Sequence, residues 1–233
     1  MLIGEVIQRV QALYSKGTPS DDSRLSNRHI YNKLRSIRAM LLSQSLNKKQ
    51  KVSEWNYQTI PCIELIEIDI NECPCTPQTN CKILRSKYKL PKPLLSLSDV
   101  AIKNVSTIDR KKIFDKYSLS SHAYKIGNKF TSEKESFFFE AGFLYIFSKT
   151  PKKVIRLVGL FEDPVEVENY ILEFCNDCTD CITCLDYLNI SFPIDESMID
   201  TVVQLAAEEL IILFSKAQED TSSNTSDNIR ENV

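Results

Sequence analysis

The stretch FFFEAGFLYIF, residues 137–147, predicts a β-hairpin in this 233-residue chain. Its two halves, 137–140 and 143–147, are short runs rich in aromatic side chains, which favour strands. Ala141 and Gly142 stand between the halves and predict a tight turn. The hairpin places an antiparallel β region in the middle of the sequence.

Further strands are predicted on both sides of the hairpin. KVIRLVGLF (153–161) follows it as a strand, and IPCIELIEIDI (60–70) precedes it with ILRSKYKL (83–90) as its candidate partner. The segment 100–160 as a whole predicts a β-meander. The two prolines of PKPLLSLSD (91–99) exclude regular structure there, because proline fixes φ and donates no hydrogen bond.

Helices are predicted before the β region. Residues 3–15 carry apolar side chains at a 3.6-residue spacing, and a narrower apolar stripe runs through 24–45. The loop 16–23 contains glycine and proline, and it offers Asp22 or Ser23 as the cap of the second helix. The two helices predict a helical hairpin.

Helices are predicted again after the β region. Asp163-Pro164 begins a helix over 165–174, because proline is tolerated in a first turn. A longer helix over 195–214 has one apolar face and, seven residues apart, a second apolar stripe: Met198, Leu205 and Ile212. The second stripe predicts contact with a neighbouring chain, but a more deeply buried helix would give the same periodicity.

The resulting fold class is α+β: an N-terminal helical hairpin, a central antiparallel β region, C-terminal helices and a disordered C-terminal tail. We expect a single domain over 1–217, with the hairpin at 3–45, the β-rich region at 56–161 and the C-terminal helices at 164–217. The tail 218–233 is polar and poor in apolar residues, which predicts a flexible segment.

The composition excludes several classes of function. The net charge is −2, from 29 basic and 31 acidic residues, so no overall field recruits nucleic acid or anionic lipid. The first residues predict no signal peptide, and no uncharged apolar stretch reaches the roughly 18 residues of a membrane span. We therefore expect a soluble protein without membrane contact, made in a reducing cytosol with its cysteines as thiols.

Cysteines are the main candidates for chemistry. Two groups are candidate metal ligands: Cys73, Cys75 and Cys81, and Cys175, Cys178, Cys181 and Cys184. Cysteines separated by two residues can both bind one tetrahedral zinc ion, so zinc is the first cofactor that the spacing predicts. An iron–sulfur cluster is a second reading, although Leu185 departs from the ferredoxin pattern. Unligated sulfur, buried as a small apolar group, is the third.

No enzyme signature accompanies the cysteines. The two histidines, His29 and His122, belong to no triad element, and the chain contains no GxSxG, HExxH or Walker-type string. We therefore predict no catalytic residues. A redox enzyme that uses the cysteines of 175–184 stays open as an alternative.

Four arginines cluster on one flank of the second predicted helix: Arg24, Arg28, Arg35 and Arg38. A helix-turn-helix DNA reader would need a turn of about three or four residues, and the loop 16–23 is longer. The flank therefore predicts a solvated or salt-bridged face, or an interface with acidic groups of an adjacent subunit.

Long strings of the sequence resemble one family of virion proteins, the head-to-tail connector (ring) proteins of crAss-like phages. The strings are IGEVIQRVQALYSKGTPSDDSRLSNRHIYNKL (3–34), WNYQTIPCIELIEI (55–68) with ECPC (72–75), LPKPLLSLSDVAIKNVSTID (90–109), GLFEDP (159–164) and FPIDESMIDTVVQLAAEELI (192–211).

The resemblance implies a non-enzymatic structural subunit of the virion. Such a subunit would form a ring, twelve-fold because connector rings follow portal symmetry. It would dock on the portal protein, contact other ring or tail proteins, and continue the channel through which DNA passes without sequence recognition. By analogy with related adaptors, helix 195–214 and its tail would engage the portal. The alternative is a cysteine-ligated zinc module that binds nucleic acid or regulates partners.

Overall fold

The computed structural model describes residues 1–15, 17, 25–68, 82–96, 99–116, 135–148, 150–175 and 186–226, with the side chains of Lys82 and of 215–226 excepted. The chain divides into two compact units. Unit 1 comprises Met1–Leu42 and Asp186–Val233, and unit 2 comprises Ser43–Leu185. The prediction of a single domain over 1–217 is not tested by this division and stays a prediction.

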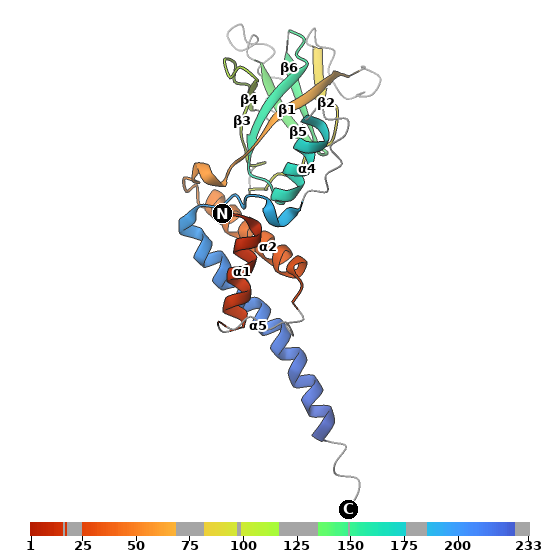
Figure 1. Cartoon of the computed structure of the whole chain (residues 1–233). Coiled ribbons are helices and arrows are strands. Elements are labelled where there is room, and N and C mark those ends of the chain that lie inside the picture. Colours follow the sequence, from red (N-terminus) through yellow and green to blue (C-terminus); the bar gives the residue numbers. More distant parts are fainter. Residues whose placement is uncertain are drawn as a thin grey trace, which may run out of the picture. The chain divides into compact units, whose positions relative to one another are not determined.

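Unit 1 is helical (Figure 1). It contains α1 (Ile3–Tyr14), α2 (Asn27–Asn47, of which residues up to Leu42 belong to this unit), the 3₁₀ turn η3 (Tyr187–Asn189) and α5 (Glu196–Ser226). The two predicted N-terminal helices are thus present. α1 packs mainly against α5 and η3. Its apolar stripe is buried there: Ile3, Val6, Ile7 and Val10.

Side chains from near each helix start cap the two N-terminal helices. The Glu5 carboxylate accepts a hydrogen bond from the Leu2 N–H (2.8 Å), which satisfies a donor that helix geometry leaves unpaired. At α2, the Ser26 hydroxyl accepts one from the His29 N–H (3.3 Å). The predicted caps Asp22 and Ser23 lie outside the described residues.

Unit 2 is built on a seven-stranded sheet in the order β3-β7-β1-β2-β6-β5-β4. All neighbours are antiparallel except β4 and β5, which are parallel. The strands are β1 (Gln58–Glu67), β2 (Lys82–Ser86), β3 (Ile102–Thr107), β4 (Asp115–Lys116), β5 (Ser136–Glu140), β6 (Phe143–Ser148) and β7 (Val154–Gly159). The α+β class is therefore confirmed.

The predicted meander over 100–160 is wrong in its connections. In a meander consecutive strands pair, but β7 lies between β3 and β1, far from β6 in the sheet order. Among the described residues of this segment, β5 and β6 alone form a regular hairpin of consecutive strands. β7 forms hydrogen bonds along both of its edges with strands distant in sequence, β1 and β3. The periodicity of a sequence predicts a strand but does not predict its partners.

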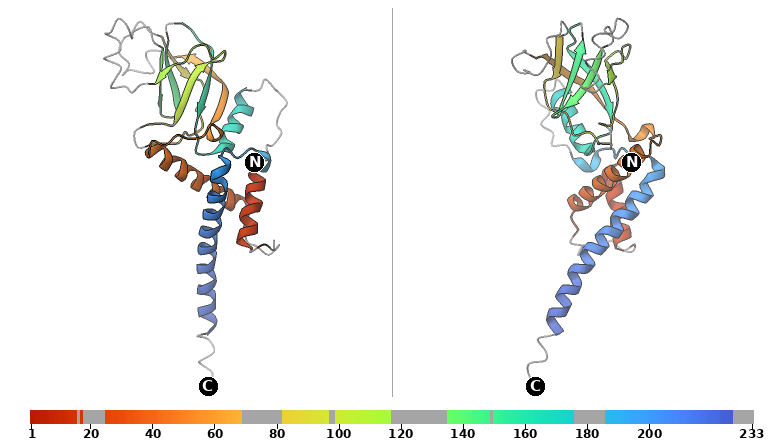
Figure 2. Two further views of the ribbon diagram at one scale, coloured as in Figure 1. Left: turned by 90° about the vertical axis from the view of Figure 1, so that its left-hand side faces the viewer. Right: turned by 180° about the vertical axis from the view of Figure 1, so that it is seen from behind.

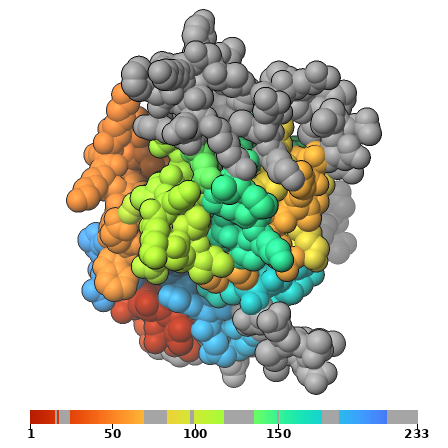
Figure 3. All heavy atoms as spheres, turned by 90° about the horizontal axis from the view of Figure 1, so that it is seen from above, coloured from red at the N-terminus to blue at the C-terminus, as the bar shows by residue number. Residues whose placement is uncertain are grey.

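The two ends of the sheet approach each other, so that the sheet nearly closes into a barrel. The chain just before β4 pairs with β3, through a bridge between Ser106 and Ile113 and a bond from the Phe114 N–H to the Val105 carbonyl (2.9 Å). In Figure 3 the yellow-green residues of β3 and β4 lie beside the green residues of β5 and β6. Closure of this kind removes exposed strand edges.

The predicted hairpin is confirmed at β5 and β6. Ala141 and Gly142 both have positive φ, 51° and 86°, as a type I′ turn requires. Across the hairpin, Phe138 stacks on Tyr145 with ring centroids 4.6 Å apart. The predicted strand pair of β1 and β2 is also present and antiparallel.

The core of unit 2 lies between the sheet and one helix, α4 (Pro164–Cys175). The Asp163 carboxylate caps this helix by accepting from the Val165 N–H (2.9 Å). α4 packs on β1. Its residues Val167 and Tyr170 join a buried cluster with strand residues that include Ile63, Leu144, Ile155 and Leu157.

The last helix is longer than predicted. We expected regular structure to end near Ala217, but α5 continues to Ser226. The residues after Phe214 include good helix formers such as Lys216, Ala217 and Glu219, which let an established helix propagate. Figures 1 and 2 show α5 extending past the end of α1. Residues 227–233 lie outside the described part of the chain.

Candidate assembly interface

Helix α5 has one face that belongs to the core of unit 1. The predicted apolar face is buried at Ile199, Val202, Val203, Ala206 and Leu210. α1 covers this region, and an exposed ion pair between Arg9 and Asp200 (3.7 Å) flanks it. At the end of α1, Tyr14 meets Phe214 edge to face, with centroids 6.3 Å apart.

Beside Phe214, α5 presents large apolar side chains to solvent. Ile211, Ile212 and Leu213 are consecutive and all exposed, Ile212 at 54%. Three exposed aliphatic residues in a row lie on successive directions around the helix, and exposed apolar surface of this kind is typical of interaction sites. We call Ile211–Leu213 the α5 apolar run.

Along the predicted second stripe of α5, the exposure of the side chains increases towards the C-terminus. Met198 and Leu205 are half-buried, whereas Ile212 is exposed and belongs to the α5 apolar run. The first two side chains therefore already contribute to unit 1. Whether the stripe contacts a neighbouring chain stays a prediction.

The arginines of the predicted flank differ in their exposure to solvent. Arg28 is exposed and Arg35 half-buried, while Arg24 lies outside the described residues. Arg38 is fully buried in unit 1. Its Nε–H donates to the Pro193 carbonyl (2.8 Å), and its guanidinium carbon lies 6.0 Å from the Phe192 ring centroid. Within unit 1, Arg38 therefore holds the segment before α5 against α2.

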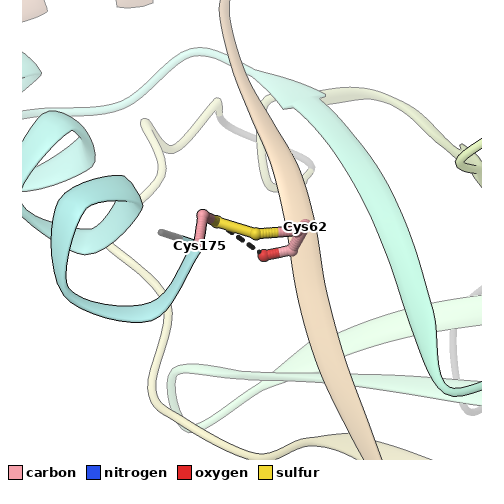
Figure 4. The surroundings of a disulfide bond; sticks show 2 residues. All are labelled: Cys62 and Cys175. Atoms are coloured by element: carbon pink, nitrogen blue, oxygen red, sulfur yellow. Dashed lines mark hydrogen bonds between the residues drawn. A yellow bond between two sulfur atoms is a disulfide. The ribbon is translucent and has the colours of Figure 1, made fainter. Parts of the chain in front are cut away.

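Cys62 and Cys175 are joined by a disulfide in unit 2, with Cα atoms 5.6 Å apart (Figure 4). The pairing of β1 with β7 is irregular between Ile60 and Ile63, where Pro61 has no N–H to donate. Cys62 lies in this irregular stretch, opposite Cys175 at the end of α4. Cys175 Sγ also lies 2.9 Å from the Cys62 carbonyl oxygen, which a reduced thiol could use as acceptor.

The predicted metal ligands are therefore only partly visible. Cys175 is bonded to Cys62, a residue outside the predicted set, and a disulfide sulfur is not the thiolate that zinc binds. The remaining six cysteines lie outside the described residues: Cys73, Cys75, Cys81, Cys178, Cys181 and Cys184. Among the residues that the structure describes, no group of three or more potential ligands gathers. Zinc binding stays a prediction.

One histidine can be placed. His29 lies in the first turn of α2, where its Nδ1 is 3.1 Å from the Ser26 hydroxyl, so it takes part in the helix cap. His122 lies outside the described residues.

A largely buried ion pair links two segments of unit 2. Lys152 and Glu135 are 10% and 14% exposed, and the Ser148 hydroxyl also donates to the Glu135 carboxylate (2.8 Å). Burial alone would raise the pKa of Glu135, but the hydrogen bonds from Lys152 and Ser148 outweigh it and lower that pKa. The pair joins the residue before β5 to the segment before β7.

Sequence reasoning missed two features. Cys62 stands alone in a strand, and its partner is 113 residues away, so no spacing signals the pair. Trp55 is the single tryptophan of the chain and is highly exposed, and a lone aromatic residue in a polar run belongs to no periodic pattern that would single it out.

In the described residues, no helix is both long and apolar enough to span a bilayer.

The family follows from a comparison with known protein families. The family model described as phage tail ring protein 2 matches residues 5–229. The chain belongs to this family of phage tail ring proteins. The resemblance to ring proteins of crAss-like phages is thereby confirmed. No curated protein matches the chain.

A phage tail ring protein has a structural role in the phage tail. The chain is accordingly a structural, non-enzymatic component of the virion that associates with further copies of itself.

Proposed function

We propose that this phage tail ring protein is a subunit of the head-to-tail connector, where its ring docks on the portal protein and continues the DNA channel towards the tail. The observation that carries the proposal is the family match over residues 5–229. The ring would contain twelve copies, because a ring stacked on a portal fits best when it shares the portal's symmetry.

The α5 apolar run is the proposed portal-docking element. Its side chains are 42–59% exposed, so their further burial against the portal would contribute roughly 1 kcal/mol each. The exposed Arg28 and the half-buried Arg35 are proposed to pair with acidic groups of an adjacent subunit. Other ring or tail proteins would contact the opposite side of the ring.

DNA would pass through the channel without sequence recognition. The near-neutral chain, with net charge −2, suits this role, because a strongly basic lumen would retain the phosphate backbone during ejection.

The test mixes purified chain with the portal protein of the same phage and images the products by electron microscopy. We expect rings stacked on portal for the wild type and for Thr201→Asp. Ile212→Asp should form rings that no longer bind portal. Thr201 is the matched control, because it is also exposed and lies about three turns earlier on α5. Undiminished portal binding by Ile212→Asp would refute the docking element, and absence of wild-type binding would refute portal docking.

A further inference from the structure

Trp55 protrudes from unit 2. It is the only tryptophan in the chain, lies in η1 (Glu54–Asn56) and is 78% exposed. A tryptophan presents 150–250 Å² of mostly apolar surface, and tryptophans dominate the binding energy of many protein interfaces. So large an exposed ring indicates a partner.

The turn that carries Trp55 is fixed on both sides. Asn56 is buried, and the backbone closes the turn through bonds from Asn56 N–H to Ser53 (3.2 Å) and from Tyr57 N–H to Glu54 (3.1 Å). Lys103 of β3 pairs with the Glu54 carboxylate and lies 4.7 Å from the Tyr57 ring centroid. Trp55 is therefore held ready for binding, which reduces the entropy lost on docking.

Unit 2 also contains an open apolar pocket of about 320 Å³. Its wall includes Leu90, Pro93, Leu95 and Phe139, and Leu95 is 58% exposed at the rim. Glu166 of α4 also lines it.

An exposed ion pair lies beside each of the two features. An exposed ion pair between Lys92 and Glu162 (2.9 Å) lies next to the pocket, and Lys92 itself lines it. An equivalent pair, Lys103 with Glu54, lies next to Trp55. When the two pairs meet in opposite orientation, each lysine faces a carboxylate of the other copy.

A ring with one kind of subunit interface needs two different, mutually complementary surfaces on each chain. Trp55 is not among the residues that line the pocket, so one chain can offer both surfaces at the same time. We propose that Trp55 of one copy inserts into the pocket lined by Leu90, Pro93, Leu95 and Phe139 of the next copy. This inference rests on the ring assembly proposed above, and it names the contact between its subunits.

Two variants test the two surfaces of the proposed contact individually. Trp55→Ala removes the inserted side chain, and Leu95→Glu places a charge at the pocket rim. Both side chains are largely exposed, so we expect each variant to unfold like the wild type, within about 0.5 kcal/mol. Neither variant should form rings alone by native mass spectrometry, whereas the wild type should.

Mixing the two variants gives the decisive result. One chain of each variant can together form one intact contact, in which Trp55 of the Leu95→Glu chain enters the unaltered pocket of the Trp55→Ala chain. We expect a species of two chains that grows no further. Because only the Leu95→Glu chain contains tryptophan, its emission should shift to shorter wavelength on mixing. No two-chain species, or no shift, would overturn the proposal.

A control addresses a rival exposed site in the same unit. Ile113 is 65% exposed beside β4, and Ile113→Ala should assemble like the wild type. Rings from Trp55→Ala but not from Ile113→Ala would assign the contact to Ile113 and overturn the inference, while leaving the ring proposal intact. A wild-type chain that stays monomeric would contradict the ring proposal itself.

Discussion

Cys175, the last residue of α4, is bonded through sulfur to Cys62 of β1, 113 residues earlier in the chain. The bond ties α4 to the strand on which it packs, next to the buried core of unit 2. It therefore closes a loop that contains most of this unit.

Reduction of this disulfide should destabilise unit 2. Opening so long a loop restores conformational freedom to the unfolded chain, so we expect the free energy of unfolding to fall by about 2–4 kcal/mol. Urea unfolding with and without dithiothreitol measures the change. Cys62→Ser should unfold like the reduced wild type and respond little to the reductant. Equal stability of the oxidised and reduced wild type would count against a stabilising bond.

The Glu135–Lys152 pair predicts sensitivity to acid. Because the pKa of folded Glu135 is lowered, its contribution to stability is present above the unfolded pKa of about 4.3. That contribution is lost as the pH falls through the lowered pKa of the folded state. Glu135→Gln should be less stable than the wild type at neutral pH and show a flatter loss of stability below pH 5. Parallel pH profiles for the two proteins would contradict this role.

Arg38 should be important for the stability of unit 1. Arg38→Met keeps an apolar stem but leaves the buried Pro193 carbonyl without the Nε–H donor, which should destabilise the unit by about 1–3 kcal/mol. Arg38→Lys keeps the charge and loses the planar donor, so we expect an intermediate effect. Thermal unfolding checks the order of the three proteins. A neutral Arg38→Met would show that other groups satisfy that carbonyl.

Two substitutions in the β5–β6 turn should change the free energy of unfolding in different directions. Gly142→Ala should destabilise unit 2 by about 1–2 kcal/mol, because φ is +86° there, although a Cβ would only reach ordinary contact with Lys89. Ala141→Asn should be neutral or stabilising, since asparagine tolerates the φ of 51° better than alanine. Urea unfolding of both variants tests the pair. The same sign for both would argue against a type I′ turn.

The sequence predicted well the elements that local physics determines. The 3.6-residue stripe gave α1, with Ile3 and Val10 buried as expected, and Asp163-Pro164 located the start of α4. The Ala141-Gly142 dipeptide located a turn that needs two positive φ angles. Each of these signals lies within one short segment.

Features that join distant segments could not be predicted. The pairing of β3 with β7, the near-closure at Ile113 and the bond from Cys62 to Cys175 each connect residues that share no local pattern. Arg38 illustrates the same limit for the candidate interface. Its spacing groups it with Arg28 and Arg35, yet it is buried because Pro193, 155 residues later, supplies an acceptor.

The mass of the purified 233-residue chain in native solution shows directly whether the subunits assemble into a ring. We expect a closed ring of one defined copy number, twelve if the ring follows the portal, and electron microscopy of the same sample should show a central channel. A chain that stays monomeric at all concentrations, both alone and when mixed with portal protein, would contradict ring assembly.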